Sequence, residues 1–380
     1  MPTHSIGLAM LWVATLAFAG VRATALQAQV RAAPDASMPA TGMDFSAVDQ
    51  FWKVADVLSK DSEPTEEQWR ALLRTPGYRL AEVNLGPVMR EAIDVALKPS
   101  RRGEYARLTQ AGDERSLVLR HLARAAARRA ELEAFRDSLA HSSLIADAVA
   151  IAARSLPRGA TGHGAPPLVA VALFRDDGYS LPQGIVIDLL NVRGTDLARN
   201  LAHEFHHSYV NRLARPLPPG SDTAPDAGLR QALYDLRNEG LADLIDKPYP
   251  FSSPNPALAG YVARYNAEYA RTPALLGRLD SLLAAVADEP ARLADAGMGA
   301  QMLFWSNGHP NGAYVAREIS ETFGVDSLRV AALDPAAFLR IYASAERSHA
   351  RPSPFSPRAW SVIDGLDARY WRPSGAGARP

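Results

Sequence analysis

The chain has 380 residues, in which 41 lysines and arginines balance 41 acidic side chains, and it contains no cysteine. The even charge balance gives no bulk electrostatic attraction to nucleic acid or to an anionic membrane. The lack of cysteine excludes disulfides, thiolate metal ligands and cysteine nucleophiles. A chain of this length can still bury a large core without cross-links.

The first residues are predicted to be a targeting segment. Residues 6–21 form an apolar run that is shorter than the roughly 20 residues a membrane-spanning helix needs. Ala23, Thr24 and Ala25 match an A-x-A cleavage site, and Ala28 is a second candidate. We therefore expect residues 1–28 to be a signal peptide and the protein to be secreted or periplasmic, with no membrane span after cleavage.

The next part of the chain is predicted to be helical. Residues 29–43 are rich in Ala, Pro, Ser and Gly and are expected to be a flexible lead-in. Residues 44–156 carry helical patterns throughout, including a capping box at Thr65 and Gln68. Residues 116–140 predict one long helix, whose basic outer face is mixed with acids and lacks an aromatic platform. A solvated face is therefore favoured over a nucleic-acid surface.

A change of period follows a Gly- and Pro-rich break at 157–166. Residues 168–174 and 184–190 predict two buried strands, and helical patterns resume from 195 to about 350. The sequence thus predicts an α+β fold that is mainly α, with a small sheet in a catalytic region spanning 157–350. Residues 351–380 are rich in proline and are expected to form a tail packed on the surface.

The central motif is His203-Glu204-x-x-His207, the HExxH pattern. A helix is expected here, with Thr195 as its N-cap and an apolar stripe through Leu197 and Leu201. On a helix the two imidazoles lie one turn apart on one side and can bind a single Zn²⁺ ion. Glu204 points beside that site, where a general base for a zinc-bound water must lie.

A catalytic zinc site normally needs a third protein ligand. A histidine six residues after His207 is excluded, because Leu213 stands there. Glu239, on the predicted helix 226–246, is the expected third ligand, with Glu268 and Asp235 as alternatives. Asp243 lies one turn after Glu239 and is expected to accept the free N–H of a ligand histidine.

Several other histidines and polar residues have expected roles in or near the site, or at the surface. His309 and Tyr314 are candidates to stabilise the oxyanion of a tetrahedral intermediate, although both can also be ordinary packing and capping residues. Asn311 is expected to cap a helix over 312–323. His206 is expected to be a polar neighbour of the site, and His121, His141, His163 and His349 to be surface residues.

These motifs resemble those of a known family. The HExxH pattern and the stretch from Asn238 to Asp243 resemble the gluzincin branch of metallopeptidases. The overall layout is most similar to a bacterial family of unknown function described as putative zinc-dependent peptidases. The resemblance implies a zincin-like catalytic region, with His203, His207 and Glu239 as metal ligands and Glu204 as base, but it implies no particular substrate.

The sequence therefore predicts an exported hydrolase, a zinc metallopeptidase that uses one Zn²⁺ ion and acts on a peptide or protein. One strand of the sheet, at 169–174 or 185–190, is expected to bind the substrate through its backbone. The alternative is an exported helical binding protein whose metal site is vestigial. Cleavage specificity and oligomeric state cannot be derived from the sequence.

Overall fold

A computed structural model describes residues 42–85, 88–162, 165–175, 178–192, 196–253 and 258–372. The predicted signal peptide, almost all of the lead-in, Thr195 and His163 lie outside these residues. Export therefore stays a prediction. No helix in the described ranges combines the length and the apolar character that crossing a bilayer requires.

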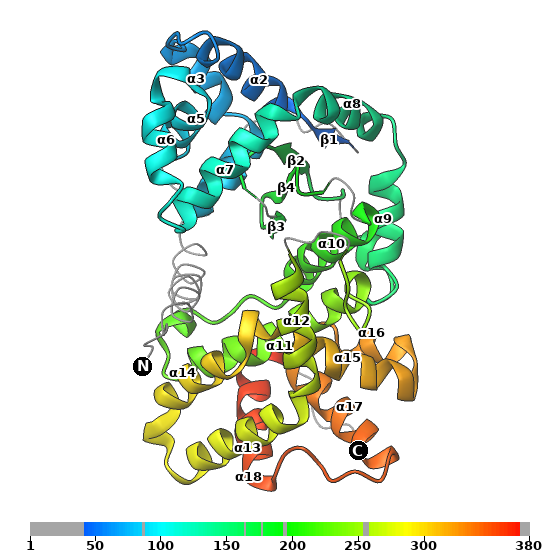
Figure 1. Ribbon diagram of the computed structural model, residues 1–380. Helices are drawn as coiled ribbons and strands as arrows, with labels where there is room; N and C mark the ends of the chain where they lie inside the picture. Colours follow the sequence, from blue (N-terminus) through cyan, green and yellow to red (C-terminus); the bar gives the residue numbers. More distant parts are fainter. Residues whose placement is uncertain are drawn as a thin grey trace, which may run out of the picture.

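The molecule has an upper and a lower half in Figure 1, with helix α10 (Leu197–Leu213) between them. The upper half contains a small sheet and the helices α2 (Ser46–Leu58), α3 (Glu66–Leu73), α4 (Pro76–Leu85), α5 (Met89–Leu97), α6 (Arg102–Leu108), α7 (Glu114–Ala127), α8 (Arg129–Ala140) and α9 (Leu144–Ala152). The lower half contains α11 (Ala227–Asp246), α12 (Ala259–Ala270), α13 (Thr272–Asp288), α14 (Leu293–Leu303), α15 (His309–Phe323), α16 (Val325–Ala331), α17 (Pro335–Ser348) and α18 (Pro357–Leu366). The predicted α+β, mainly α class is confirmed.

Local sequence signals explain where some of these helices begin and end. The capping box is present, because Thr65 accepts a hydrogen bond from the backbone of Gln68 and Gln68 accepts one from the backbone of Thr65. The prediction of one long helix over 116–140 is wrong. Arg128 leaves the helical conformation, with φ −113° and ψ 22°, and separates α7 from α8. This break turns α8, so that Leu132 and Leu139 are buried in the core.

The sheet has four strands in the order β1-β2-β4-β3. The strands are β1 (Met43–Asp44), β2 (Val169–Ala172), β3 (Gly178–Leu181) and β4 (Gly184–Asp188). The two predicted strands are β2 and β4, which pair in parallel and are buried along their whole length. Neither is an edge strand, so the expectation that one of them binds substrate through its backbone is wrong. In the described chain the edges are β1 and β3, and β3 is the one that contacts α10.

A buried carboxylate fixes the turn that leads from β4 towards α10. Asp188 accepts hydrogen bonds from the backbone N–H groups of Phe174, Leu190 and Asn191, at 2.8 to 3.0 Å. His121 Nε2 lies 2.9 Å from the same carboxylate. His121 was expected at the surface, but it is only 3% exposed. It ties α7 to the end of the sheet.

Loss of this carboxylate should destabilise the fold. Asp188→Ala leaves several buried donors without an acceptor, so we expect the free energy of unfolding to fall by about 2–4 kcal/mol. Urea denaturation followed by circular dichroism measures this change. Asp49→Ala is the control, because Asp49 is half exposed and forms a surface pair with Arg136. A loss of less than about 1 kcal/mol is expected there.

The buried apolar side chains form two main clusters. One contains the sheet, helices α2 to α9 and the apolar side of α10 (Leu197–Leu213). The other is built from α11 and α13 to α18. The segment expected to be a surface tail contributes α18 and the buried side chains of Phe355, Ile363 and Tyr370 to this second cluster. Helices α10 and α11 therefore belong to different clusters and contact each other where the clusters meet.

Candidate metal centre

Helix α10 carries the HExxH motif. Its N-cap is Asp196, whose side chain accepts a hydrogen bond from the backbone of Arg199, so the helix begins after Asp196 and not after Thr195. Leu201 and Phe205 are fully buried on the side that faces the sheet cluster. His203 and His207 lie one turn apart on the same side of the helix, with their rings edge to face and the ring centroids 4.7 Å apart.

Helices α11 and α15 approach each other closely enough for their backbones to touch. A Cβ on Gly240 would lie 2.2 Å from the carbonyl carbon of Gly312, and a Cβ on Gly312 would lie 1.9 Å from the carbonyl oxygen of Leu236. No side chain fits at this crossing. Gly240 follows Glu239, and Gly312 lies one turn after His309. The crossing therefore places these two side chains beside each other.

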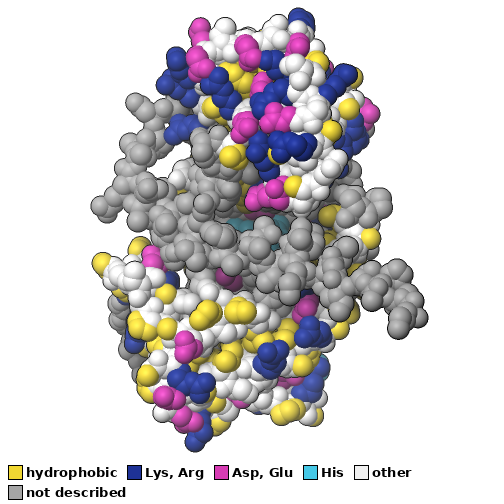
Figure 2. Space-filling view, turned by 60° about the vertical axis from the view of Figure 1, so that its left-hand side comes forward, with side chains coloured by type: hydrophobic (Ala, Val, Ile, Leu, Met, Phe, Trp, Pro, Cys, Tyr) yellow, Lys and Arg dark blue, Asp and Glu magenta, His cyan; other side chains and the backbone are white. Residues whose placement is uncertain are grey.

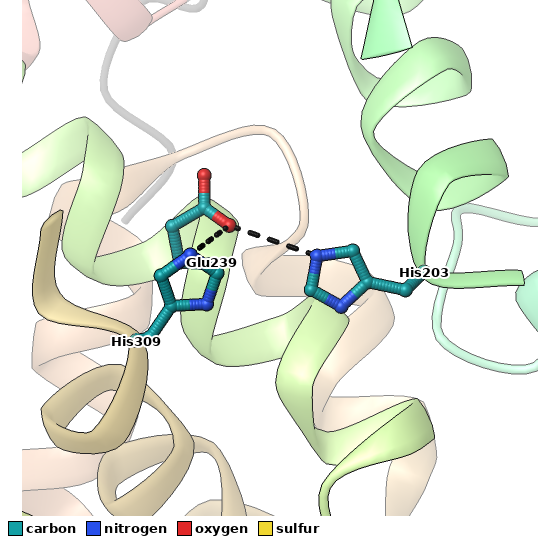
Figure 3. Close-up of side chains that lie close together, drawn as sticks. All are labelled: His203, Glu239 and His309. Atoms are coloured by element: carbon teal, nitrogen blue, oxygen red, sulfur yellow. Dashed lines mark ion pairs between the residues drawn. The ribbon is translucent and has the colours of Figure 1, made fainter. Parts of the chain in front are cut away.

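Three imidazoles converge on one carboxylate oxygen, Glu239 Oε2. The Nε2 atom of His207 lies 3.1 Å from this oxygen, that of His309 3.3 Å and that of His203 3.8 Å. The Nε2 atoms of His203 and His207 are 3.0 Å apart. Figure 3 shows the Glu239 carboxylate between His203, from α10, and His309, at the start of α15. The structure thus brings together the predicted ligands His203, His207 and Glu239, with His309 beside them.

Each imidazole is held at its other nitrogen, Nδ1. His203 Nδ1 lies 3.0 Å from Asp246, and His309 Nδ1 lies 2.9 Å from Asp243. His207 Nδ1 lies 2.8 Å from the side-chain amide nitrogen, Nδ2, of Asn238. An acceptor at Nδ1 keeps the proton on that nitrogen and leaves Nε2 free to bind a metal ion. Asp243 was expected to accept from a ligand histidine, and the histidine closest to it is His309.

The four converging atoms fit a metal ion. Bonds of about 2.0–2.1 Å to zinc imply ligand atoms about 3.3 Å apart at the corners of a tetrahedron. The three distances from Glu239 Oε2, of 3.1, 3.3 and 3.8 Å, and the 3.0 Å between the Nε2 atoms of His203 and His207 lie around that value. The buried Oδ1 of Asn238 has no hydrogen-bond partner in the described chain. Turning this amide over would let Oδ1 accept the Nδ1–H that a metal-binding His207 carries.

A second group of possible ligands already holds a cation. His203, Asp243 and Asp246 also lie close together, but the ammonium of Lys247 is 2.6 Å from Asp243 Oδ1 and 3.1 Å from Asp246 Oδ2. This lysine balances the two carboxylates that orient His203 and His309. Tyr265 donates a further hydrogen bond to Asp243, at 2.9 Å. The carboxylates are therefore fixed by partners within the protein.

The charges of the site are strongly coupled. Burial lowers the pKa of His207, but the charge of Glu239 and the smaller effect of Glu204 raise it to about 9. Burial likewise opposes a charged His309, yet Asp243 and Glu239 raise the pKa of that imidazole. Burial would raise the pKa of Glu239, and the neighbouring histidines instead hold it well below its usual range. The pocket therefore favours positive charge beside an ionised Glu239.

Glu204 and His206 are the other polar residues near the motif. Glu204 is partly buried, and its negative charge contributes to the raised pKa of His207. His206 is fully buried, and burial lowers its pKa well below the usual value. Its ring centroid lies 6.2 Å from that of His207, and neither of its ring nitrogens has a hydrogen-bond partner in the described ranges. In Figure 2 histidine side chains are visible between the upper and lower parts of the molecule.

The remaining candidates lie elsewhere. Tyr314 packs edge-on against the rings of Tyr269 and Tyr342, at centroid distances of 5.3 and 6.3 Å, and no described contact joins it to the cluster. Its predicted role stays a prediction. Asn311 is not the helix cap, because α15 already begins at His309 and Asn311 is buried, donating hydrogen bonds to Glu268 and Thr272.

The two alternative third ligands are also placed. Glu268 pairs with Arg271 at 2.9 Å. Asp235 accepts a hydrogen bond from Gln231 at 2.7 Å, and burial together with Glu239 raises its pKa to about 7. The groups of side chains that could hold a metal ion in the described chain are His203 with Glu239 and His309, and His203 with Asp243 and Asp246. Glu268 and Asp235 belong to neither group.

Sequence reasoning missed three residues that support the site: Asn238, Asp246 and Lys247. Asp246 lies seven residues after Glu239, which is two turns along the same side of α11. That spacing was the signal that could have found it. The role of Asn238 and Lys247 depends on contacts between helices, and no local pattern marks it.

A family model described as putative zinc dependent peptidase matches residues 69–350. The chain belongs to this family. The matched residues include α10, α11 and α15. No curated protein and no solved structure matches the chain.

The glycine crossing should control metal binding. Gly312→Ala places a Cβ against the backbone of α11, so we expect α15 to shift away from Glu239 and the affinity for Zn²⁺ to fall by at least about tenfold. Competition with a fluorescent chelator measures this affinity. Gly277→Ala, also within a helix but with no atom near the added methyl group, is the matched control. It should leave zinc binding unchanged and raise stability by about 0.5–1 kcal/mol.

Proposed function

We propose that this protein is an exported zinc peptidase that binds one Zn²⁺ ion through His203, His207 and Glu239 and uses Glu204 as its general base. The observation that carries the proposal is the convergence of the two HExxH imidazoles on the carboxylate of Glu239. Membership of a family described as zinc-dependent peptidases supports hydrolysis of peptide bonds in general. The leader predicted at residues 1–28 supports secretion or a periplasmic location.

The chemistry follows from the groups that surround the site. A zinc ion in such a site acts as a Lewis acid and lowers the pKa of a bound water towards 7. Glu204 accepts a proton from the attacking water, whose oxygen forms a bond to the carbonyl carbon of the peptide. Glu204 then delivers the proton to the leaving nitrogen as the C–N bond breaks. Asp246, and Asn238 once its amide is turned over, keep the ligand imidazoles in the tautomer that this arrangement requires.

The substrate is proposed to bind along β3. This strand has β4 on one side and no strand on the other in the described chain, and it contacts α10, which carries Glu204. An extended peptide can pair with such an edge through backbone hydrogen bonds. These bonds do not depend on the side chains of the peptide.

Replacing the proposed base tests the mechanism. Glu204→Gln preserves the size of the side chain and removes its basicity, so we expect one bound zinc per chain and a loss of peptide hydrolysis of at least about a hundredfold. Zinc content and turnover of a mixed peptide library are measured on the same preparation. Glu321→Gln, on an exposed glutamate of α15, is the matched control and should retain full turnover. Unchanged turnover in Glu204→Gln would refute the assigned role.

The same measurements address the alternative, an exported binding protein with a vestigial site. Wild-type protein that holds zinc but turns over no peptide of the library would favour that reading. The presence of Glu204 beside a complete ligand set favours the peptidase, because a binding protein has no use for a base at this position.

A further inference from the structure

His309 shares the features of the two predicted ligand histidines. Its Nδ1 is held by a carboxylate at 2.9 Å, as His203 Nδ1 is held by Asp246 at 3.0 Å. Its Nε2 is directed at Glu239 Oε2, at 3.3 Å, which is closer than the Nε2 of His203. The rings of His203 and His309 are nearly parallel, with an interplanar angle of 13°. A group that donates a hydrogen bond to substrate needs its Nε2 turned to open space, whereas this Nε2 is turned to a ligand oxygen.

We propose that His309 is the fourth protein ligand of the metal centre, which closes the coordination sphere until a substrate displaces it. This inference rests on the proposed zinc site. It differs from an oxyanion role for His309, because the imidazole then occupies the position that a substrate or water must take. Four protein ligands are typical of closed zinc sites, and three of catalytic ones. The site therefore has to open for hydrolysis, and one ligand must be replaceable.

His309 is the ligand best placed to leave. Its side chain is 20% exposed, compared with 7% for His203 and 10% for His207, so an incoming molecule reaches it first. The other two histidines lie in the middle of α10, whereas His309 is the first residue of α15. Rotation of its side chain can release the position while the glycine crossing keeps α15 in place.

The backbone before His309 is built to hold it in this position. Ser306, Asn307 and Gly308 have φ values of 52°, 52° and 82°, so two residues with a Cβ adopt the left-handed conformation. This conformation is unfavourable for residues that carry a Cβ. Trp305, which begins this segment, contacts the ring of Tyr261 and lies under the guanidinium of Arg264. Such strain is maintained where the surrounding contacts fix a functional side chain.

Zinc K-edge X-ray absorption of the full-length zinc-loaded protein tests the proposal by counting imidazole ligands. We expect three imidazoles in the wild type and two in His309→Ala and His309→Gln, with one zinc in each protein and an affinity at least about tenfold weaker in both variants. His349→Ala removes an exposed histidine that is hydrogen-bonded to Thr322 and should change neither number. Acetohydroxamate added to the wild type should lower the count from three to two.

The possible outcomes separate this inference from the proposed function. Two imidazoles in the wild type, with unchanged zinc affinity in the His309 variants, would overturn the fourth ligand and leave the peptidase proposal standing. Three imidazoles that persist in saturating acetohydroxamate would overturn the displacement. A wild-type protein that binds no zinc would remove the basis of both proposals.

Discussion

The arrangement of the site depends on the backbone contact between α11 and α15 at Gly240 and Gly312. Helices with ordinary side chains at the contact stay 8–10 Å apart, and glycine allows a closer approach. This approach brings the side chain of Glu239 to that of His309, although the two residues are 309 − 239 = 70 positions apart in the sequence. A methyl group on either glycine would push the helices apart. The displacement would exceed the difference between the shortest and the longest of the distances among the imidazole nitrogens and Glu239 Oε2.

Hydrogen bonds at the outer nitrogens complete what the helix crossing begins. The partners of the three imidazoles, Asn238, Asp243 and Asp246, all lie on α11, within eight residues of one another along the chain. This one helix thus supplies Glu239 and the three groups that orient the imidazoles around it. Lys247, immediately after the helix, compensates for the charge of two of them. The electrostatics of the site are therefore decided largely by a single segment of sequence.

The sequence predicts those parts of the site that lie within one helix. His203, Glu204 and His207 are placed by helical periodicity alone, and Glu239 and Asp243 by a four-residue spacing on the next helix. The position of His309 relative to Glu239 could not be predicted, because it arises from the crossing of two helices distant in sequence. The burial of His121 could not be predicted for the same reason. No local spacing links this histidine to its partner Asp188, which lies on another element.

Short elements were also hard to predict. Strands β1 and β3 have two and four residues, and their identity depends on pairing with longer neighbours. The buried runs of β2 and β4 were recognised because apolar residues continue through both strands without alternation. The order of the strands, which makes β3 an edge, follows from tertiary packing, and no single segment encodes it.

The junction of the two apolar clusters has a thermodynamic consequence. His203 and His207 belong to a helix packed in one cluster, while Glu239 and His309 are carried by helices of the other. An ion chelated by all of them acts as a cross-link between two cores that otherwise cohere through their contact surface. Ligand linkage adds about 2.7 kcal/mol when free metal exceeds its Kd about a hundredfold. The concentration of free metal would then determine how stably the two clusters stay associated, in addition to whether the site is active.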